Sequence, residues 1–95
     1  MVSFKDNATE DLYHGRWSVR VRRFPTVVQA NAVRKLAALN AASTLDDLAS
    51  PPGNRLEPLH GNYAGHLSIR VNNQWRIVFR WLDSHAVDVS LTDYH

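Results

Sequence analysis

The strongest constraint on the fold is an alternation of apolar and polar residues in the last third of the chain. It recurs in three runs, 67–71, 75–81 and 87–91. A period of two places the apolar side chains of each strand on one side of the sheet. The chain is therefore predicted to build a sheet with one buried face and one polar face, with a further short strand at 2–5.

The turn at 72–74 fixes how the first two runs pair. A two-residue loop would pair Val71 with the last turn residue, and would put Arg76 and Arg80 on the apolar face. A three-residue loop pairs Val71 with Trp75 and keeps the apolar residues of both strands together. The three-residue loop is therefore the predicted connection.

That register places Arg70 directly opposite Arg76 on the polar face. Like charges opposed across two strands are mildly destabilising unless something offsets them. Asp88 on the third strand is one possible partner. A phosphate is another, because two guanidinium groups make a strong phosphate clamp. The pattern alone leaves open a third possibility, two arginines that are simply exposed to solvent.

The clearest helix is predicted from Pro25 to Ala42. Its interior is rich in good helix formers, and proline suits the first turn of a helix. Four apolar residues fall on one face at helical spacing, and they are the candidate core of the helix: Val28, Ala32, Leu36 and Leu39.

Two shorter helical segments are expected at 9–14 and 44–48. Thr9 or Asn7 is a plausible N-cap for the first, and Thr44 heads a capping-box pattern in the second. A run of proline and glycine at 50–54 then breaks the chain, and 55–65 is predicted to be a loop.

Composition narrows the class of protein. The 95 residues are 44% hydrophobic and contain no cysteine, which excludes a disulfide framework and a thiolate metal site. No apolar run approaches the length that spans a bilayer, and the first residues lack the apolar core of a signal peptide. We expect one cytoplasmic domain covering residues 1–95.

Basic residues are clustered although the net charge is only +2. The densest cluster, Arg16, Arg20, Arg22 and Arg23, lies in a segment predicted to be an exposed and mobile loop. Such clustering is typical of a surface that binds nucleic acid, and it is equally compatible with an ordinary solvated surface.

The chain ends in Asp93, Tyr94 and His95, directly after the third run. Histidine exchanges protons near neutral pH, and tyrosine can stack on a base. The competing interpretation is a frayed terminus without a function.

Four segments taken together, 50–59, 61–62, 67–77 and 87–95, resemble the HigB-type toxins of the RelE superfamily. The resemblance implies a small α+β domain with helices packed on one face of a twisted, mainly antiparallel sheet. It implies ribosome-dependent cleavage of messenger RNA without a metal or other cofactor, giving a 2′,3′-cyclic phosphate and a 5′-hydroxyl. The implied partner is a HigA-type helix-turn-helix antitoxin, through which alone the toxin would reach operator DNA.

The resemblance also assigns roles to residues. Arg70 and Arg76 would stabilise negative charge on the phosphorane, and His95 would act as an acid or base. Asp93 would orient the tail, and Tyr94 would stack on or steer a base.

Two positions depart from the family pattern. Relatives often carry histidine and lysine where this chain has Glu57 and His60. Glu57 could serve as the general base and His60 could replace a cation, so the acid–base assignment stays open.

The resemblance gives the arginine-rich loop two possible roles. Its arginines could grip the backbone of ribosomal RNA, or the loop could bind the antitoxin. For the whole protein, two alternatives to the ribosome-dependent nuclease also remain. One is a non-catalytic module that only binds the antitoxin or nucleic acid, and the other is a ribonuclease that needs no ribosome.

Overall fold

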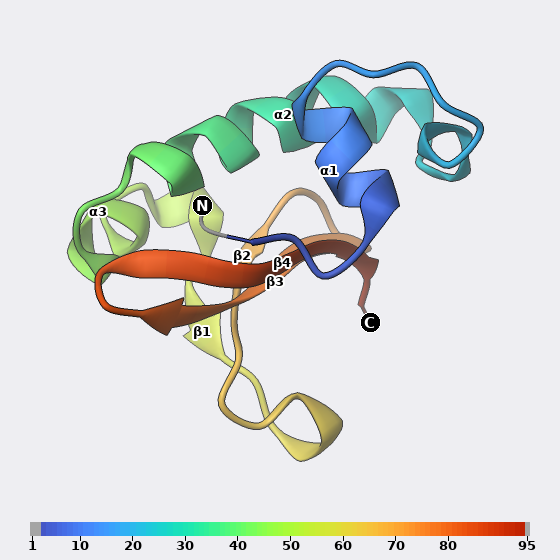
Figure 1. Ribbon diagram of the computed structural model, residues 1–95. Helices are drawn as coiled ribbons and strands as arrows, with labels where there is room; N and C mark the ends of the chain where they lie inside the picture. Colours follow the sequence, from blue (N-terminus) through green and yellow to red (C-terminus); the bar gives the residue numbers. More distant parts are fainter. Residues whose placement is uncertain (1–2, 95) are drawn as a thin grey trace.

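The computed structural model describes residues 3–94, which form helices on one side and a sheet on the other. The helices are α1 (Asn7–Tyr13), α2 (Thr26–Ala41) and α3 (Leu45–Ala49), and the strands are β1 (Glu57–Pro58), β2 (Leu67–Arg70), β3 (Trp75–Leu82) and β4 (His85–Asp93). The sheet is antiparallel with the order β1-β2-β3-β4. Figure 1 shows α1 and α2 on the same side of it, which confirms the predicted α+β class.

The predicted hairpin register is confirmed. Ile69 pairs with Ile77 and Arg70 pairs with Arg76, and the Val71 amide donates to the Trp75 carbonyl at 2.9 Å. The turn holds this shape without a glycine because the Asn72 side chain accepts from two backbone amides, those of residues 74 and 75.

A β-bulge shifts the alternation in β4. Val78 pairs with Ser90 but Arg80 pairs with Val87, so β4 has one residue more than β3 between these two pairs. Asp88 takes up the extra residue with a φ of 52°. The prediction that Val87 lies on the buried face is therefore wrong, and Ala86, which is 1% exposed, lies there instead.

The core lies between α2 and the sheet. All four predicted core residues of α2 are buried, and so are Ile69, Ile77 and Phe79 of the facing strands. The capping box at Thr44 is present as predicted, with Asp47 as its reciprocal partner.

The N-terminal segment differs from the prediction. Phe4 makes only an isolated parallel bridge to Val89, while Val2 lies outside the described residues. The N-cap of α1 is Asp6 rather than Thr9 or Asn7, because the Asp6 carboxylate accepts the Thr9 amide. Thr9 is buried, and its hydroxyl accepts the Leu91 amide at 3.0 Å.

The segment expected to be a loop at 55–65 contains β1. Glu57 pairs with Ser68 and Pro58 pairs with Leu67, which adds a fourth strand at the edge of the sheet. A two-residue strand containing a proline shows no alternation from which it could be predicted. Within residues 3–94, no helix combines the length and apolar character needed to cross a membrane.

Candidate active site

The polar face of the sheet points away from α2 and carries two of the candidate catalytic side chains, Arg70 and Arg76. Across the strands, Arg76 of β3 lies between Arg70 of β2 and Thr92 of β4. Its neighbour in sequence, Ile77, points into the core, so Arg76 itself points to the open side.

The Arg76 guanidinium is held on several sides. Its Nη2 lies 3.1 Å from Glu57 Oε1 and donates to the carbonyl of Arg55 at 2.9 Å. Its Nε donates to Ser68 Oγ at 2.7 Å. The Arg76 side chain is only 13% exposed, so its orientation is fixed before any ligand binds.

Asp88, one of the possible partners considered for the arginine pair, does not pair with it. Asp88 lies 3.5 Å from Arg80, at the other end of β3, and does not contact Arg70 or Arg76. Glu57 takes its place because the short strand β1 brings it to the edge of the polar face.

Arg70 has a different environment. It donates to the side chain of Asn73 in the hairpin turn, and no carboxylate of residues 3–94 lies within ion-pair distance of it. Its positive charge is therefore less compensated than that of Arg76, which leaves it suited to an anionic ligand.

Two further cations stand near the hairpin on α2. Asn31 donates to the Val71 carbonyl at 2.9 Å, which ties α2 to the hairpin, and Arg34 donates to Asn31. Lys35 donates to the side chain of Asn54. Burial, then the charges of Arg34 and Arg70, lower the pKa of Lys35, so the three cations share one region of positive potential.

The C-terminal segment is anchored to the hairpin as far as Tyr94. The Tyr94 amide donates to the Gln74 carbonyl, and the Gln74 side chain donates to Asp93 Oδ2, both at 2.9 Å. The Tyr94 ring lies edge-on to Tyr63 at 5.7 Å. The interpretation of the C-terminus as a frayed end is therefore wrong as far as Tyr94. His95, the predicted acid or base, lies outside the described residues.

Gln74 and Tyr63 were not identified from the sequence. The only signal for Gln74 was its place in the predicted turn beside the root of the tail. Tyr63 lies at the end of a short turn, Gly61–Tyr63, that follows His60. No pattern in the sequence indicates that its ring contacts Tyr94.

His60 is exposed at the start of that turn. The Tyr63 amide donates to the backbone carbonyl of His60 at 3.2 Å. In the part of the chain that is described, the structure joins Glu57 to Arg76 but does not join the His60 side chain to either of them.

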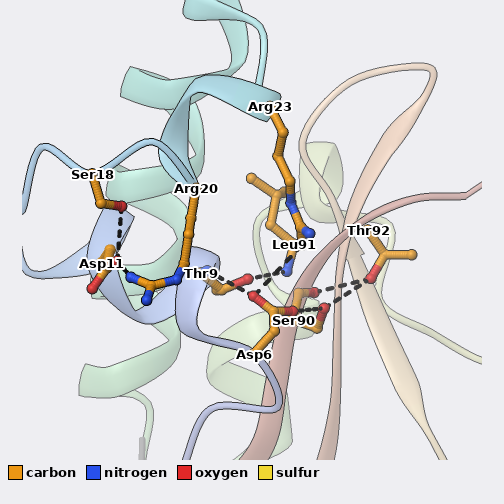
Figure 2. A network of polar contacts seen from close by, with 9 residues as sticks. All are labelled: Asp6, Thr9, Asp11, Ser18, Arg20, Arg23, Ser90, Leu91 and Thr92. Carbon is orange, nitrogen blue, oxygen red and sulfur yellow. Dashed lines mark hydrogen bonds and ion pairs between the residues drawn. The ribbon is translucent and has the colours of Figure 1, made fainter.

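The arginine-rich loop is tied to α1 by two aspartates, as Figure 2 shows. Asp11 accepts from Ser18 at 2.8 Å and from Arg20 at 3.0 Å, and lies 3.5 Å from Arg16. Asp6 lies 3.7 Å from Arg23. Three of the four arginines predicted to bind RNA therefore have a carboxylate partner within the protein.

Both aspartates favour the ionised form. The hydrogen bond from Ser18 is the main cause that lowers the pKa of Asp11, with Arg20 adding to it. Burial raises the pKa of Asp6, but hydrogen bonds from Ser90 and Thr9 outweigh it, so the net direction is down. These ionised aspartates hold the loop that was expected to be mobile.

No three histidine, aspartate or glutamate side chains within residues 3–94 lie close enough together to hold a metal ion.

Comparisons with known proteins show similarity to the HigB toxins. A family model described as the RelE-like toxin of type II toxin-antitoxin system HigB matches residues 2–95. Toxin HigB-1 of Vibrio cholerae is 42% identical over 90 residues, which cover 95% of this chain and 93% of that protein. Endoribonuclease HigB of Proteus vulgaris is 33% identical over 61 residues, or 64% of this chain and 65% of that protein.

A solved structure shares the fold at low sequence identity. It is the YoeB-YefM complex from Staphylococcus aureus, which is 17% identical with a TM-score of 0.60, covering 100% of this chain and 97% of that one.

Proposed function

Because the chain belongs to the HigB family of RelE-like toxins of type II toxin–antitoxin systems, we propose that it stops translation by cutting messenger RNA on the ribosome. One similar protein is itself named an endoribonuclease. The observation that carries the proposal is the fixed guanidinium of Arg76 beside Arg70 on the open face of the sheet.

A fixed guanidinium suits this chemistry. A phosphodiester gains negative charge as it passes through a phosphorane, and donors that are already oriented stabilise that charge without reorganising. Arg76 is oriented by Glu57 and Ser68, and Arg70 is the less compensated charge opposite it. We assign both arginines to the scissile phosphate.

The reaction would be an internal transfer. The 2′-hydroxyl oxygen of the RNA attacks the adjacent phosphorus, and the bond from phosphorus to the 5′ oxygen breaks. A base takes the proton of the 2′-hydroxyl, and an acid supplies one to the departing 5′ oxygen. The products are a 2′,3′-cyclic phosphate and a 5′-hydroxyl.

The C-terminal residues would supply contacts to the nucleotide. His95 is the candidate acid or base, and Tyr94 the candidate ring for stacking on a base. Asp93 would position the tail through its hydrogen bond with Gln74, which also accepts the Tyr94 amide.

Glu57 and His60 take less direct roles in this proposal. Oε1 of Glu57 already faces Arg76, so holding that guanidinium is its first role. It would act as the general base only if its carboxylate also reached the 2′-hydroxyl. His60 is exposed on a separate turn, and its service as an added cation remains a prediction.

The partner of the toxin is the antitoxin of its own system, and we propose that this antitoxin is of the HigA helix-turn-helix type. Operator DNA would then meet the toxin only through the antitoxin. The ribosome and messenger RNA would be its targets in the bacterial cytoplasm. The loop arginines would be candidates for contact with ribosomal RNA or with the antitoxin: Arg16, Arg20, Arg22 and Arg23.

The test is primer extension on messenger RNA in a translating bacterial extract. The protein should cut inside codons, and Arg76→Ala should lower the cleavage rate by about 100-fold or more, the effect of removing one preorganised donor. Arg80→Ala is the matched control, because Arg80 lies on the same strand but pairs with Asp88, and its rate should be unchanged.

Two results would contradict the proposal. A protein that binds its antitoxin but yields no cleavage in the extract would be a non-catalytic binding module. Rapid cutting of naked RNA by the pure protein would indicate a ribonuclease that does not need the ribosome.

A further inference from the structure

An apolar groove lies on the helical side of the molecule, between α1, the arginine-rich loop and α2. Its volume is about 390 Å³, and its lining is mainly apolar. Leu12 comes from α1, Trp17 and Val21 come from the loop, and Ala30 and Val33 come from α2. None of these side chains belongs to the polar face that carries Arg70 and Arg76.

Large apolar side chains are exposed beside the groove. Trp17 is 84% exposed, Val19 75% and Val27 85%. Val27, Ala30 and Val33 follow one another at three-residue spacing, so Val27 extends the apolar face of α2 beyond the groove. Exposed apolar surface of this kind around a concave site is typical of a protein–protein contact.

The shape of the groove is held by contacts within the chain. Asp11 accepts from Ser18 and Arg20, which fixes the loop that carries Trp17. Gln29 of α2 donates to the Phe24 carbonyl at 2.9 Å, which fixes the end of the same loop. A partner would therefore not have to order this surface before binding to it.

Positive charge lies next to the apolar lining: Arg16 itself lines the groove, and Arg20 and Arg22 are the sequence neighbours of the lining residue Val21. Arg16 and Arg20 share the single carboxylate of Asp11, and their side chains are 58% and 56% exposed. Arg22 is exposed, and no carboxylate of residues 3–94 lies within ion-pair distance of it. The complement to this surface is a segment with apolar side chains flanked by acidic ones.

RNA is a weaker fit to the same surface. Two of its arginines are committed to Asp11, which competes with phosphate for them. The groove itself is lined mainly by apolar side chains, which offer few hydrogen-bond donors to a charged phosphate backbone.

We propose that this groove is the docking site for the antitoxin, which would insert an amphipathic acidic segment. Apolar side chains of that segment would fill the space beside Trp17 and Val27, and its carboxylates would face Arg16 and Arg22. The inference rests on the proposed function, because it takes the existence of an antitoxin from it and adds where and how that antitoxin binds.

The test uses the full-length toxin and the purified product of the antitoxin reading frame beside its gene. Trp17→Ala combined with Val27→Ala should weaken binding at least about tenfold, as expected for the loss of apolar anchors at an interface. Leu82→Ala is the matched control, because Leu82 is also an exposed apolar residue, at 48%, but lies at the end of β3. Its affinity should equal that of the wild type.

Two further readouts follow from the same surface. The indole emission of the wild type should shift to the blue when the antitoxin is added, and Trp17→Phe should lose most of that shift. Arg22→Glu should also weaken binding, because it reverses an exposed charge next in sequence to the lining residue Val21. The variants at Trp17 and Val27 should cleave messenger RNA at the wild-type rate when no antitoxin is present.

The outcomes separate the inference from its premise. If the wild type binds and the double variant binds equally well, the docking site is wrong while the proposed function stands. If the double variant loses cleavage but keeps the antitoxin, the surface faces the ribosome and the inference is overturned. If the wild type does not bind the antitoxin at all, the proposed partner is wrong and the docking site is wrong with it.

Discussion

At the residue scale, Arg76 shows what its neighbours contribute. Its opposition to Arg70 follows from strand alternation, and the sequence was sufficient to predict it. Its partners were not predictable, because they come from three separate segments that no sequence pattern brings together. They are the carboxylate of Glu57, the hydroxyl of Ser68 and the carbonyl of Arg55. Arg55 presents its carbonyl from a left-handed conformation, with φ at 45°.

Substitution of Glu57 separates positioning from proton transfer. Glu57→Gln should slow cleavage only about fivefold, because an amide oxygen still accepts from Arg76 and a neutral acceptor costs about 1 kcal/mol. The shape of the pH–rate profile should stay the same. Glu57→Lys should reduce cleavage nearly as far as Arg76→Ala, because the new cation repels the guanidinium. Initial rates in the translating extract between pH 5 and 9 would measure both.

The opposite pattern would give Glu57 another role. If Glu57→Gln abolished cleavage and removed the acidic limb of the pH–rate profile, Glu57 would be the general base rather than a positioning residue.

At the scale of elements, long periodic segments were predictable and short irregular ones were not. The helix α2 and the β2–β3 hairpin repeat their patterns over many residues, so local preference and burial agree. The two residues of β1 are too few to show a period. The bulge in β4 was missed because Val87, Val89 and Leu91 alternate in sequence as in a regular strand, whereas only the last two face the core.

The bulge makes a stability prediction at Asp88. Its φ of 52° suits glycine and strains a β-branched residue. Asp88→Gly should leave the free energy of unfolding within about 1 kcal/mol, since it loses only an exposed ion pair with Arg80. Asp88→Val should lower it by about 1–3 kcal/mol. Urea denaturation of both variants would measure the difference, and equal stabilities would mean that β4 pairs without the bulge.

At the scale of the whole molecule, charge is divided between two surfaces. On the helical side, Asp6 and Asp11 pair with arginines of the loop. Near the hairpin, Arg70 stands with Arg34 and Lys35 of α2, and no carboxylate of residues 3–94 lies within ion-pair distance of these three cations. The net charge of +2 therefore hides a concentration of positive charge next to the candidate active site.

This division predicts which cations face RNA. Each phosphate contact adds about one unit to the salt dependence of binding, because a condensed counterion is released. Lys35→Ala should reduce the slope of log affinity for the 70S ribosome against log salt by about one. Arg22→Ala is the control, since Arg22 is equally basic but lies in the loop on the helical side, and its slope should not change. A filter-binding series between about 50 and 200 mM salt covers the range in which such slopes are resolved. If Arg22→Ala lowered the slope and Lys35→Ala did not, RNA would follow the arginine-rich loop, and the positive charge near the hairpin would serve only the scissile phosphate.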